Sequence, residues 1–227
     1  MPLAVLMPVA ITLYLVKNCL IVLTALFPIV NPLGTSPIFL RLTPGYTPEE
    51  RHILSRKVAV NSYILLLASM LIGSHILTFF GISLPVVQVG GGLIVVANGW
   101  MLLQQREEPT QAQPNKKVTC DEITSSAFYP LTLPLTVGPG SISVAITLGA
   151  NEGLHFDSLT RLFAAVIGIA LVAITVYLSY RFAANLERLL GESAMNVIVR
   201  LSSFILVCIG VQIVWNGAKA LLSSLPR

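Results

Sequence analysis

The sequence predicts an all-α integral membrane protein with six transmembrane helices, arranged as two inverted three-helix repeats whose first and fourth helices are broken by proline and glycine. Three observations lead to this prediction. Of the 227 residues, 55% are hydrophobic and only 11% are charged, whereas soluble domains carry about 25% charged residues. Long apolar runs follow one another along the chain, and one proline-rich pattern occurs twice.

Each apolar run can supply the roughly 20 residues that a spanning helix needs. The runs cover 9–40, with Lys17 as the one interruption, 58–80, 82–103, 123–150, 162–180 and 201–218. The longest polar stretch, 104–122, is too short to fold alone. We therefore expect one membrane domain, 1–227, with repeat one over about 9–104, a cytoplasmic linker over about 105–122 and repeat two over about 123–218. No Lys or Arg precedes Lys17, unlike in a secretory signal, so we expect the first helix to be retained.

The first run contains the stretch FPIVNPLGTSPIFL, 27–40, with three prolines and a glycine. Pro32 lacks a backbone donor and clashes with the preceding turn, so the first helix should stop near Asn31. Ser36 followed by Pro37 is typical of an N-cap and a first helical residue, so a short half-helix should begin there.

The second and third runs have simpler signals. Thr47, Pro48 and Glu50 form a capping box with proline at the first helical position, so the second helix should start there, in the cytoplasm. Gly90, Gly91 and Gly92 lie in the third run, where small residues allow a close helix–helix approach.

The fourth run repeats the first. FYPLTLPLTVGPGSISVAI begins at Phe128, and its three prolines keep the spacing of those in 27–40 at an offset of 102. TPEER at 47–51 matches DSLTR at 157–161, and FGISLPVVQV from Phe80 matches LGESAMNVIV from Leu190, both at an offset of 110. Three spans per repeat would give the second copy the opposite orientation, as in many secondary transporters.

Gly138 and Pro139 should then begin a second half-helix that faces the first. The first N–H groups of a helix lack intrahelical partners and attract carboxylates. Nearby hydroxyls and an amide can also accept from an ammonium group, so a small zwitterion would suit the pair. The candidate substrate-binding residues are Asn31, Gly34, Thr35, Ser36, Thr136, Gly138, Gly140 and Ser141. In the alternative, the prolines only kink two helices and neighbouring hydroxyls satisfy the freed carbonyls.

Polar residues elsewhere in the spans add little. Asn61 and Asn98 are further cavity candidates, while Arg200, just before the sixth run, is expected to reach toward the surface. No Asp or Glu lies in the middle of a predicted span, which disfavours a carboxylate proton relay.

The basic residues predict the orientation. Nine Lys or Arg fall on one side of the membrane and three on the other, with Lys17 and Arg200 left out. The positive-inside rule assigns the first side to the cytoplasm and both termini to the periplasm. The cytoplasmic set is Arg41, Arg51, Arg56, Lys57, Arg106, Lys116, Lys117, Arg181 and Arg188.

Several functional classes have no support in the sequence. The three cysteines have no metal-binding or disulfide spacing, so we expect no metal and no cofactor. HExxH, GxSxG and paired membrane acids are absent, so we expect no enzyme. The expected partners are the lipid bilayer and a small-molecule substrate, a zwitterionic amino acid, and no nucleic acid. Assembly into a homo-oligomer is a further possibility that the sequence does not decide.

Three stretches together resemble the MarC family of bacterial inner-membrane proteins: NPLGTSPIFL at 31–40, LPLTVGPGSIS at 133–143 and FGISLPVVQVGGGLIVV at 80–96. The matching signature residues are Asn31, Pro32, Gly34, Pro37, Pro134, Gly138, Pro139 and Gly140. The resemblance covers nearly the whole chain and implies a six-helix, multi-pass inner-membrane protein of the neutral amino acid transporter group.

Two functions therefore stand at this stage. One is a secondary transporter, an exporter or exchanger, of small neutral amino acids or similar small metabolites. The other is a non-transporting membrane stress or assembly protein whose repeat is only architectural.

Overall fold

A computed structural model of the chain describes residues 3–104, 120–151 and 159–224, and this part is built of helices and short turns. The predicted linker and the match at 157–161 lie largely outside these ranges. The elements are α1 (Leu3–Val30), α2 (Pro32–Leu42), α3 (Pro48–Phe79), α4 (Leu84–Gln104), α5 (Cys120–Ser126), η1 (Ala127–Thr136), α6 (Pro139–Asn151), α7 (Leu159–Arg181) and α8 (Ala183–Ser223).

The predicted all-α membrane architecture is confirmed. Among the described residues, five helices are long and apolar enough to cross a membrane. A sixth span is formed if the helical pair Ile123–Thr136 and Pro139–Ala150, bent by 72°, is counted as one. α2 follows α1 after a break at Asn31, so the first predicted run is also interrupted.

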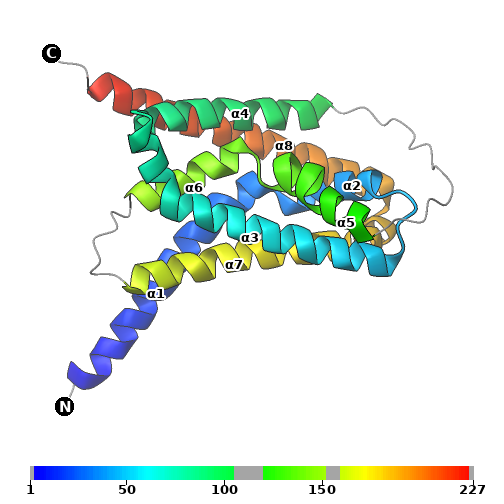
Figure 1. Cartoon of the computed structure of the whole chain (residues 1–227), viewed down its shortest axis with the longest axis horizontal. Coiled ribbons are helices and arrows are strands. Elements are labelled where there is room, and N and C mark those ends of the chain that lie inside the picture. Colours follow the sequence, from blue (N-terminus) through cyan, green and yellow to red (C-terminus); the bar gives the residue numbers. More distant parts are fainter. Residues whose placement is uncertain (1–2, 105–119, 152–158, 225–227) are drawn as a thin grey trace.

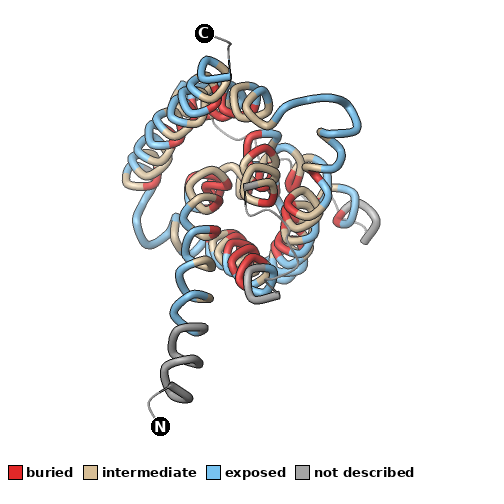
Figure 2. Tube along the Cα trace, turned by 90° about the vertical axis from the view of Figure 1, so that its left-hand side faces the viewer, coloured by how far each residue is buried: buried red, intermediate tan, exposed pale blue. Residues whose placement is uncertain are grey.

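The helices form two outer pairs with the broken helices between them (Figure 1). α4 packs on α8 along one side, and α3 packs on α7 along the other. α6 contacts α3 and α4, while α2 contacts α7 and α8. α1 packs on α7, and η1 packs on α3. In the end view the buried residues gather on the inward faces of this arrangement (Figure 2). The short half-helices α2 and α6 therefore lie inside the bundle.

Glycines bring α4 and α8 close together. A Cβ atom on Gly92 would lie 2.9 Å from the carbonyl oxygen of Gly210, and one on Gly210 would lie 2.9 Å from that of Gly92. A Cβ on Gly91 would overlap the side chain of Ser143 in α6. The predicted packing role is thus confirmed for Gly91 and Gly92, whereas Gly90 faces open space.

Two glycines in the left-handed region mark α4 and α8. Gly81 has φ 66° and precedes α4, and Gly191 has φ 78° and interrupts α8. L-amino acids with a side chain rarely adopt these values, which makes glycine the fitting residue. These are the two glycines that the sequence match at an offset of 110 aligned.

The start of α3 confirms the predicted capping box. The Thr47 hydroxyl accepts from the Glu50 N–H at 3.2 Å, and the Glu50 carboxylate accepts from the Thr47 N–H at 2.7 Å. Pro48 occupies the first helical position, where its missing N–H costs nothing.

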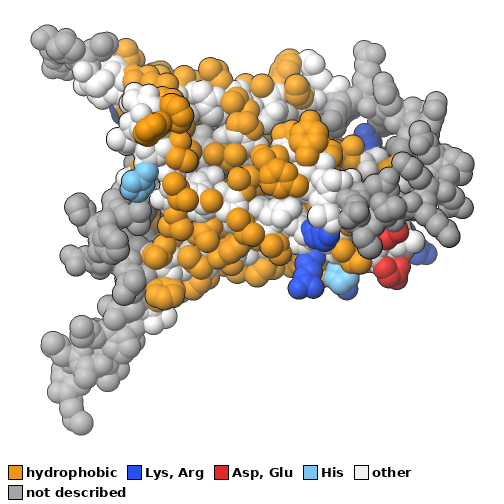
Figure 3. Space-filling model, in the orientation of Figure 1, with side chains coloured by type: hydrophobic (Ala, Val, Ile, Leu, Met, Phe, Trp, Pro, Cys, Tyr) orange, Lys and Arg blue, Asp and Glu red, His pale blue; other side chains and the backbone are white. Residues whose placement is uncertain are grey.

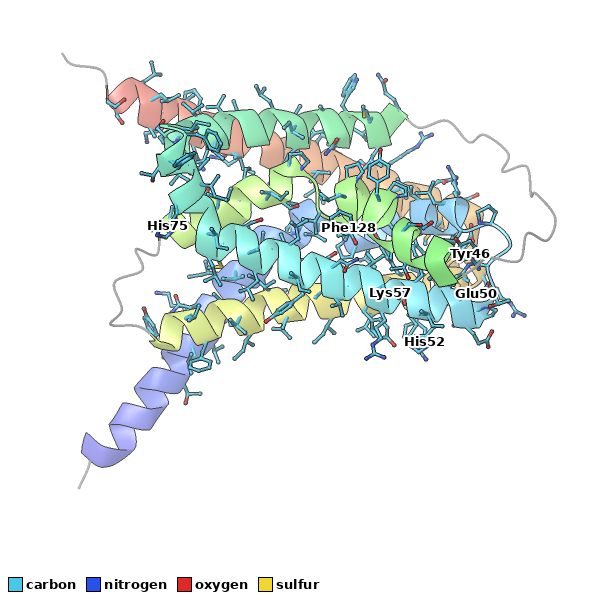
Figure 4. All side chains as sticks on the ribbon, in the orientation of Figure 1. Tyr46, Glu50, His52, Lys57, His75 and Phe128 are labelled. Atoms are coloured by element: carbon cyan, nitrogen blue, oxygen red, sulfur yellow. The ribbon has the colours of Figure 1, made fainter. Side chains whose placement is uncertain are left out.

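The outer surface has the pattern of a membrane protein. Large apolar side chains cover the middle of the face in Figure 3, and Lys, Arg, Asp and Glu gather toward one end. His52 and His75 lie toward opposite ends of α3 (Figure 4). At about 1.5 Å per residue they are about 35 Å apart along the helix, close to the thickness of a bilayer's hydrocarbon core.

Candidate functional site

The first break is made by Asn31. This residue has φ 48° and ψ 54°, a left-handed conformation that Asn tolerates better than most residues. Its Oδ1 atom accepts from the Gly34 N–H at 3.2 Å and caps α2, which begins at Pro32. The predicted stop near Asn31 is confirmed, but the predicted restart at Ser36 and Pro37 is wrong.

Pro37 lies inside α2 instead, and Ser36 compensates for it. A proline at position 37 cannot donate to the Leu33 carbonyl one turn earlier. The Ser36 hydroxyl donates to this carbonyl at 2.8 Å. Ser36 therefore replaces the backbone hydrogen bond that Pro37 cannot make, and it is not the N-cap of the helix.

The second break is spread over η1. Tyr129 and Leu133, each preceding a proline, have extended backbones, as the residue before proline prefers. The hydroxyls of Thr132 and Thr136 donate to the carbonyls of Ala127 and Leu131, at 2.7 and 2.6 Å. Hydroxyl-to-carbonyl bonds thus occur at this break too, although the acceptors are not the carbonyls four residues before Pro130 and Pro134.

The start of α6 differs, because donors are left over there. α6 begins at Pro139, as predicted, and the Gly138 carbonyl accepts from the Ile142 N–H at 3.1 Å. The N–H groups of Gly140 and Ser141 precede the first intrahelical bond, and Gly138 has no side chain to cap them. Hydroxyl repair of carbonyls does not account for these two groups.

A cavity of about 210 Å³ lies between the two breaks. Six of the eight candidate residues line it: Asn31, Thr35, Thr136, Gly138, Gly140 and Ser141. Asn98 of α4 also lines it, as the sequence suggested, whereas Asn61 is not among the lining residues. The remaining lining residues are apolar: Ile29, Val30, Ile38, Val95, Met101, Leu102, Pro134, Leu135 and Leu206.

The other two candidates, Gly34 and Ser36, serve packing and helix repair and do not line this cavity. A Cβ atom on Gly34 would lie 2.6 Å from the Ser202 hydroxyl oxygen, so glycine lets α2 approach α8. Gly140 combines both roles, because it lines the cavity and a Cβ there would also overlap Val95.

Asn31 and Asn98 are the two amide residues among those that line the cavity. The side chain of Asn31 is 6% exposed, and its Nδ2 atom has no hydrogen-bond partner. The Nδ2 atom of Asn98 lies 3.6 Å from the position that a Cβ on Gly138 would take, so this amide faces the start of α6. No ionisable side chain lines the cavity.

Tyr180 of α7 joins the two breaks, a role that the sequence did not indicate. Its hydroxyl donates to Thr35 at 3.0 Å and lies 2.8 Å from the Thr136 hydroxyl. Its ring stacks on Phe39 with a centroid distance of 4.5 Å. The only signal was a tyrosine at the end of an apolar run, which is also typical of membrane interfaces.

Arg200 is exposed, in line with its expected reach toward the surface, but its place in the helix differs from the prediction. It lies inside α8, because this helix starts far earlier than the sixth apolar run. With Arg41 it lines a small space of about 30 Å³ that shares Ile38 and Leu102 with the central cavity. No group of three or more His, Cys, Asp or Glu that could hold a metal occurs in the described ranges.

Comparison with known proteins identifies the family. The model of the MarC family of integral membrane proteins matches residues 16–222. The chain belongs to the MarC family. It is therefore a multi-pass integral membrane protein, and the resemblance seen in the three signature stretches is confirmed.

MarC-family relatives cover most of the chain. The membrane protein YvbG of Bacillus subtilis is 32% identical over 88% of this chain and 93% of its own length. The inner membrane protein MarC of Salmonella typhimurium is 32% identical over 89% and 94%. A membrane protein of Archaeoglobus fulgidus is 32% identical over 89% and 92%. No solved structure matches this chain.

Proposed function

We propose that this MarC-family chain is a secondary transporter of small neutral amino acids or similar zwitterionic metabolites, and that the cavity between the broken helices is its substrate site. The observation that carries the proposal is the unpartnered Nδ2 of Asn31, on a nearly fully buried side chain that lines the cavity. A buried donor without a partner costs about 1–3 kcal/mol. A ligand that accepts from it removes this cost.

The groups around the cavity suit a carboxylate on one side. The N–H groups of Gly140 and Ser141, at the positive end of α6, can donate to it together with Asn31. The ammonium group of the substrate would donate hydrogen bonds to oxygen atoms of Asn98, Thr35 and Thr136. The lack of ionisable lining residues favours a substrate with no net charge. At about 210 Å³ the cavity is smaller than the 300–1,000 Å³ typical of drug-sized ligands, which favours a small substrate.

The packing supports an inverted repeat. Exchanging α1, α2, α3 and α4 for η1, α6, α7 and α8 turns one set of contacts into the other: α1 on α7 becomes η1 on α3, α6 on α3 becomes α2 on α7, and α6 on α4 becomes α2 on α8. The pairs α3–α7 and α4–α8 exchange into themselves. Rocking of one half against the other around the fixed cavity would then give alternating access.

The small space lined by Arg41 and Arg200 adjoins the cavity at Ile38 and Leu102, toward the end that the positive-inside rule assigns to the cytoplasm. Two guanidinium groups would attract the carboxylate of a substrate at this end. This favours uptake of substrate from the cytoplasm, as in an exporter or exchanger.

Counterflow in proteoliposomes tests the proposal. Vesicles containing the full-length protein are loaded with unlabelled glycine or alanine, and the labelled amino acid is added outside. We expect transient accumulation with the wild type and with Asn216→Ala, a control on α8 outside the cavity, and a loss of at least tenfold in initial rate with Asn31→Ala, Asn98→Ala and Gly138→Leu. A lack of accumulation by inserted wild-type protein across a panel of small metabolites would instead favour the non-transporting alternative.

A further inference from the structure

A second hollow lies on the outside of the bundle between α3 and α7. Its volume is about 570 Å³, and it shares no lining residue with the central cavity. We call it the α3–α7 groove. It is lined by His52, Arg56, Ala59, Val60, Tyr63, Ala170, Ala173, Ile174 and Tyr177.

The floor of the groove is apolar and open to the side that faces lipid. Three alanines, Ala59, Ala170 and Ala173, leave room between the two helices. Val60 and Ile174 are 49% and 50% exposed, so the floor lies at the surface of the bundle rather than in its core. In an integral membrane protein this surface contacts hydrocarbon chains.

One end of the groove is basic. Arg56 and His52 line it, and the His52 Nε2 atom lies 2.8 Å from the Tyr177 hydroxyl. Arg181 donates to the same hydroxyl at 2.8 Å, which brings a second guanidinium group to this end. No lining residue is acidic. The acids nearby on α3, Glu49 and Glu50, lie in its first turn, and Glu50 is engaged by the Thr47 N–H.

The basic end and the apolar floor lie at different depths. Figure 4 shows His52 toward one end of α3, on the side of α7. Tyr63 lies about 16 Å further along the helix axis, at about 1.5 Å per residue. A molecule that fills the groove therefore needs an anionic head at the membrane interface and an apolar tail about that long, running along the helices.

We propose that the α3–α7 groove binds one anionic phospholipid, with its phosphate at Arg56, Arg181 and His52 and an acyl chain along the alanine floor. Arginine suits phosphate because its planar guanidinium donates in a forked geometry. Basic pockets between transmembrane helices commonly bind anionic head groups. The positive-inside count assigns this end to the cytoplasm, so the lipid would come from the inner leaflet.

Native mass spectrometry of the full-length protein tests this without any transport assay. The protein is titrated with phosphatidylglycerol and with phosphatidylcholine of the same chain length. We expect wild type to bind the first phosphatidylglycerol at least fivefold more tightly than phosphatidylcholine. Arg56→Gln should abolish this preference, while Arg188→Gln, which removes an exposed arginine of α8, should leave it unchanged.

A second pair of variants tests the floor. Val60→Trp covers the alanines from an exposed position and should weaken binding of both lipids at least fivefold, whereas Ile64→Trp, at an exposed position of α3 outside the groove, should weaken neither. Equal binding of both lipids by the wild type would overturn the proposal. So would a phosphatidylglycerol preference that survives Arg56→Gln, or binding that survives Val60→Trp.

Discussion

Replacing Tyr180 by phenylalanine removes one hydroxyl from the point where both broken helices meet. The ring remains, so its stacking on Phe39 is kept. The Thr35 hydroxyl already donates to the Asn31 carbonyl at 3.0 Å, and that of Thr136 to the Leu131 carbonyl at 2.6 Å. The tyrosine proton can then serve only one of the two threonines fully at a time.

The variant therefore loses about one hydrogen bond rather than two. Such a bond contributes about 0.5–1.5 kcal/mol in proteins and about 0.6 kcal/mol between membrane helices. We expect Tyr180→Phe to lower the free energy of unfolding by about 1 kcal/mol. Because the lost bond links the two halves through α7, we also expect a changed rate of counterflow.

Reversible unfolding in mixed micelles measures the first effect, and counterflow measures the second. Tyr180→Ala serves as the comparison, since it also removes a fully buried ring and should cost about 3–5 kcal/mol. If Tyr180→Phe lowered the free energy of unfolding by more than about 2.5 kcal/mol, the inference that only one hydrogen bond is lost would be wrong. Unchanged stability together with unchanged counterflow would refute the linking role itself.

Three further predictions separate repair, packing and capping from substrate binding. Ser36→Ala leaves the Leu33 carbonyl unpaired and should lower the free energy of unfolding by about 1–3 kcal/mol, with an unchanged KM for transport; a raised KM would mean that Ser36 contacts substrate. Gly92→Leu forces a side chain against the Gly210 backbone and should prevent stable folding in detergent, as followed by size-exclusion chromatography, whereas Gly90→Leu should not. Thr47→Ala removes the cap of α3 and should cost about 1 kcal/mol in the same unfolding assay.

Features with local causes could be predicted from the sequence. The capping box of α3 depends only on Thr47, Pro48 and Glu50 and their spacing. The breaks at Asn31 and Gly138 follow from the proline after each, which cannot continue the preceding helix. The apolar runs similarly follow from composition, because the bilayer demands about 20 apolar residues per span.

Features that depend on neighbouring helices could not be predicted from the sequence. Pro32 and Pro37 both suit a first helical position, and the choice between them was decided by the ability of Asn31 to adopt the left-handed conformation and cap Gly34. The linking role of Tyr180 depends on where α7 packs, which an apolar run without periodicity does not indicate. For the same reason Gly34 looked like part of a site, whereas it accommodates Ser202 of α8.

The hydrogen bonds around the cavity distinguish a repaired kink from a binding site. Hydroxyls at both breaks donate their protons to backbone carbonyls, as Thr35, Thr136 and Ser141 do. These bonds satisfy acceptors and leave lone pairs on the hydroxyls, of which Thr35 uses one to accept from Tyr180. The groups without a partner are donors, the Nδ2 of Asn31 and the uncapped N–H groups at the start of α6. Buried orphan donors are rarer in proteins than under-satisfied carbonyls.

A chain that needed only to kink two helices would have no use for surplus donors next to a cavity. In the proposed transporter, a substrate carboxylate would supply the missing acceptors, and the remaining hydroxyl lone pairs would accept from its ammonium group. The donors come from both breaks, and so do the acceptors, so one substrate would contact both broken helices. Movement of either half would then change the contacts of the other, and this couples substrate binding to alternating access in the proposed transporter.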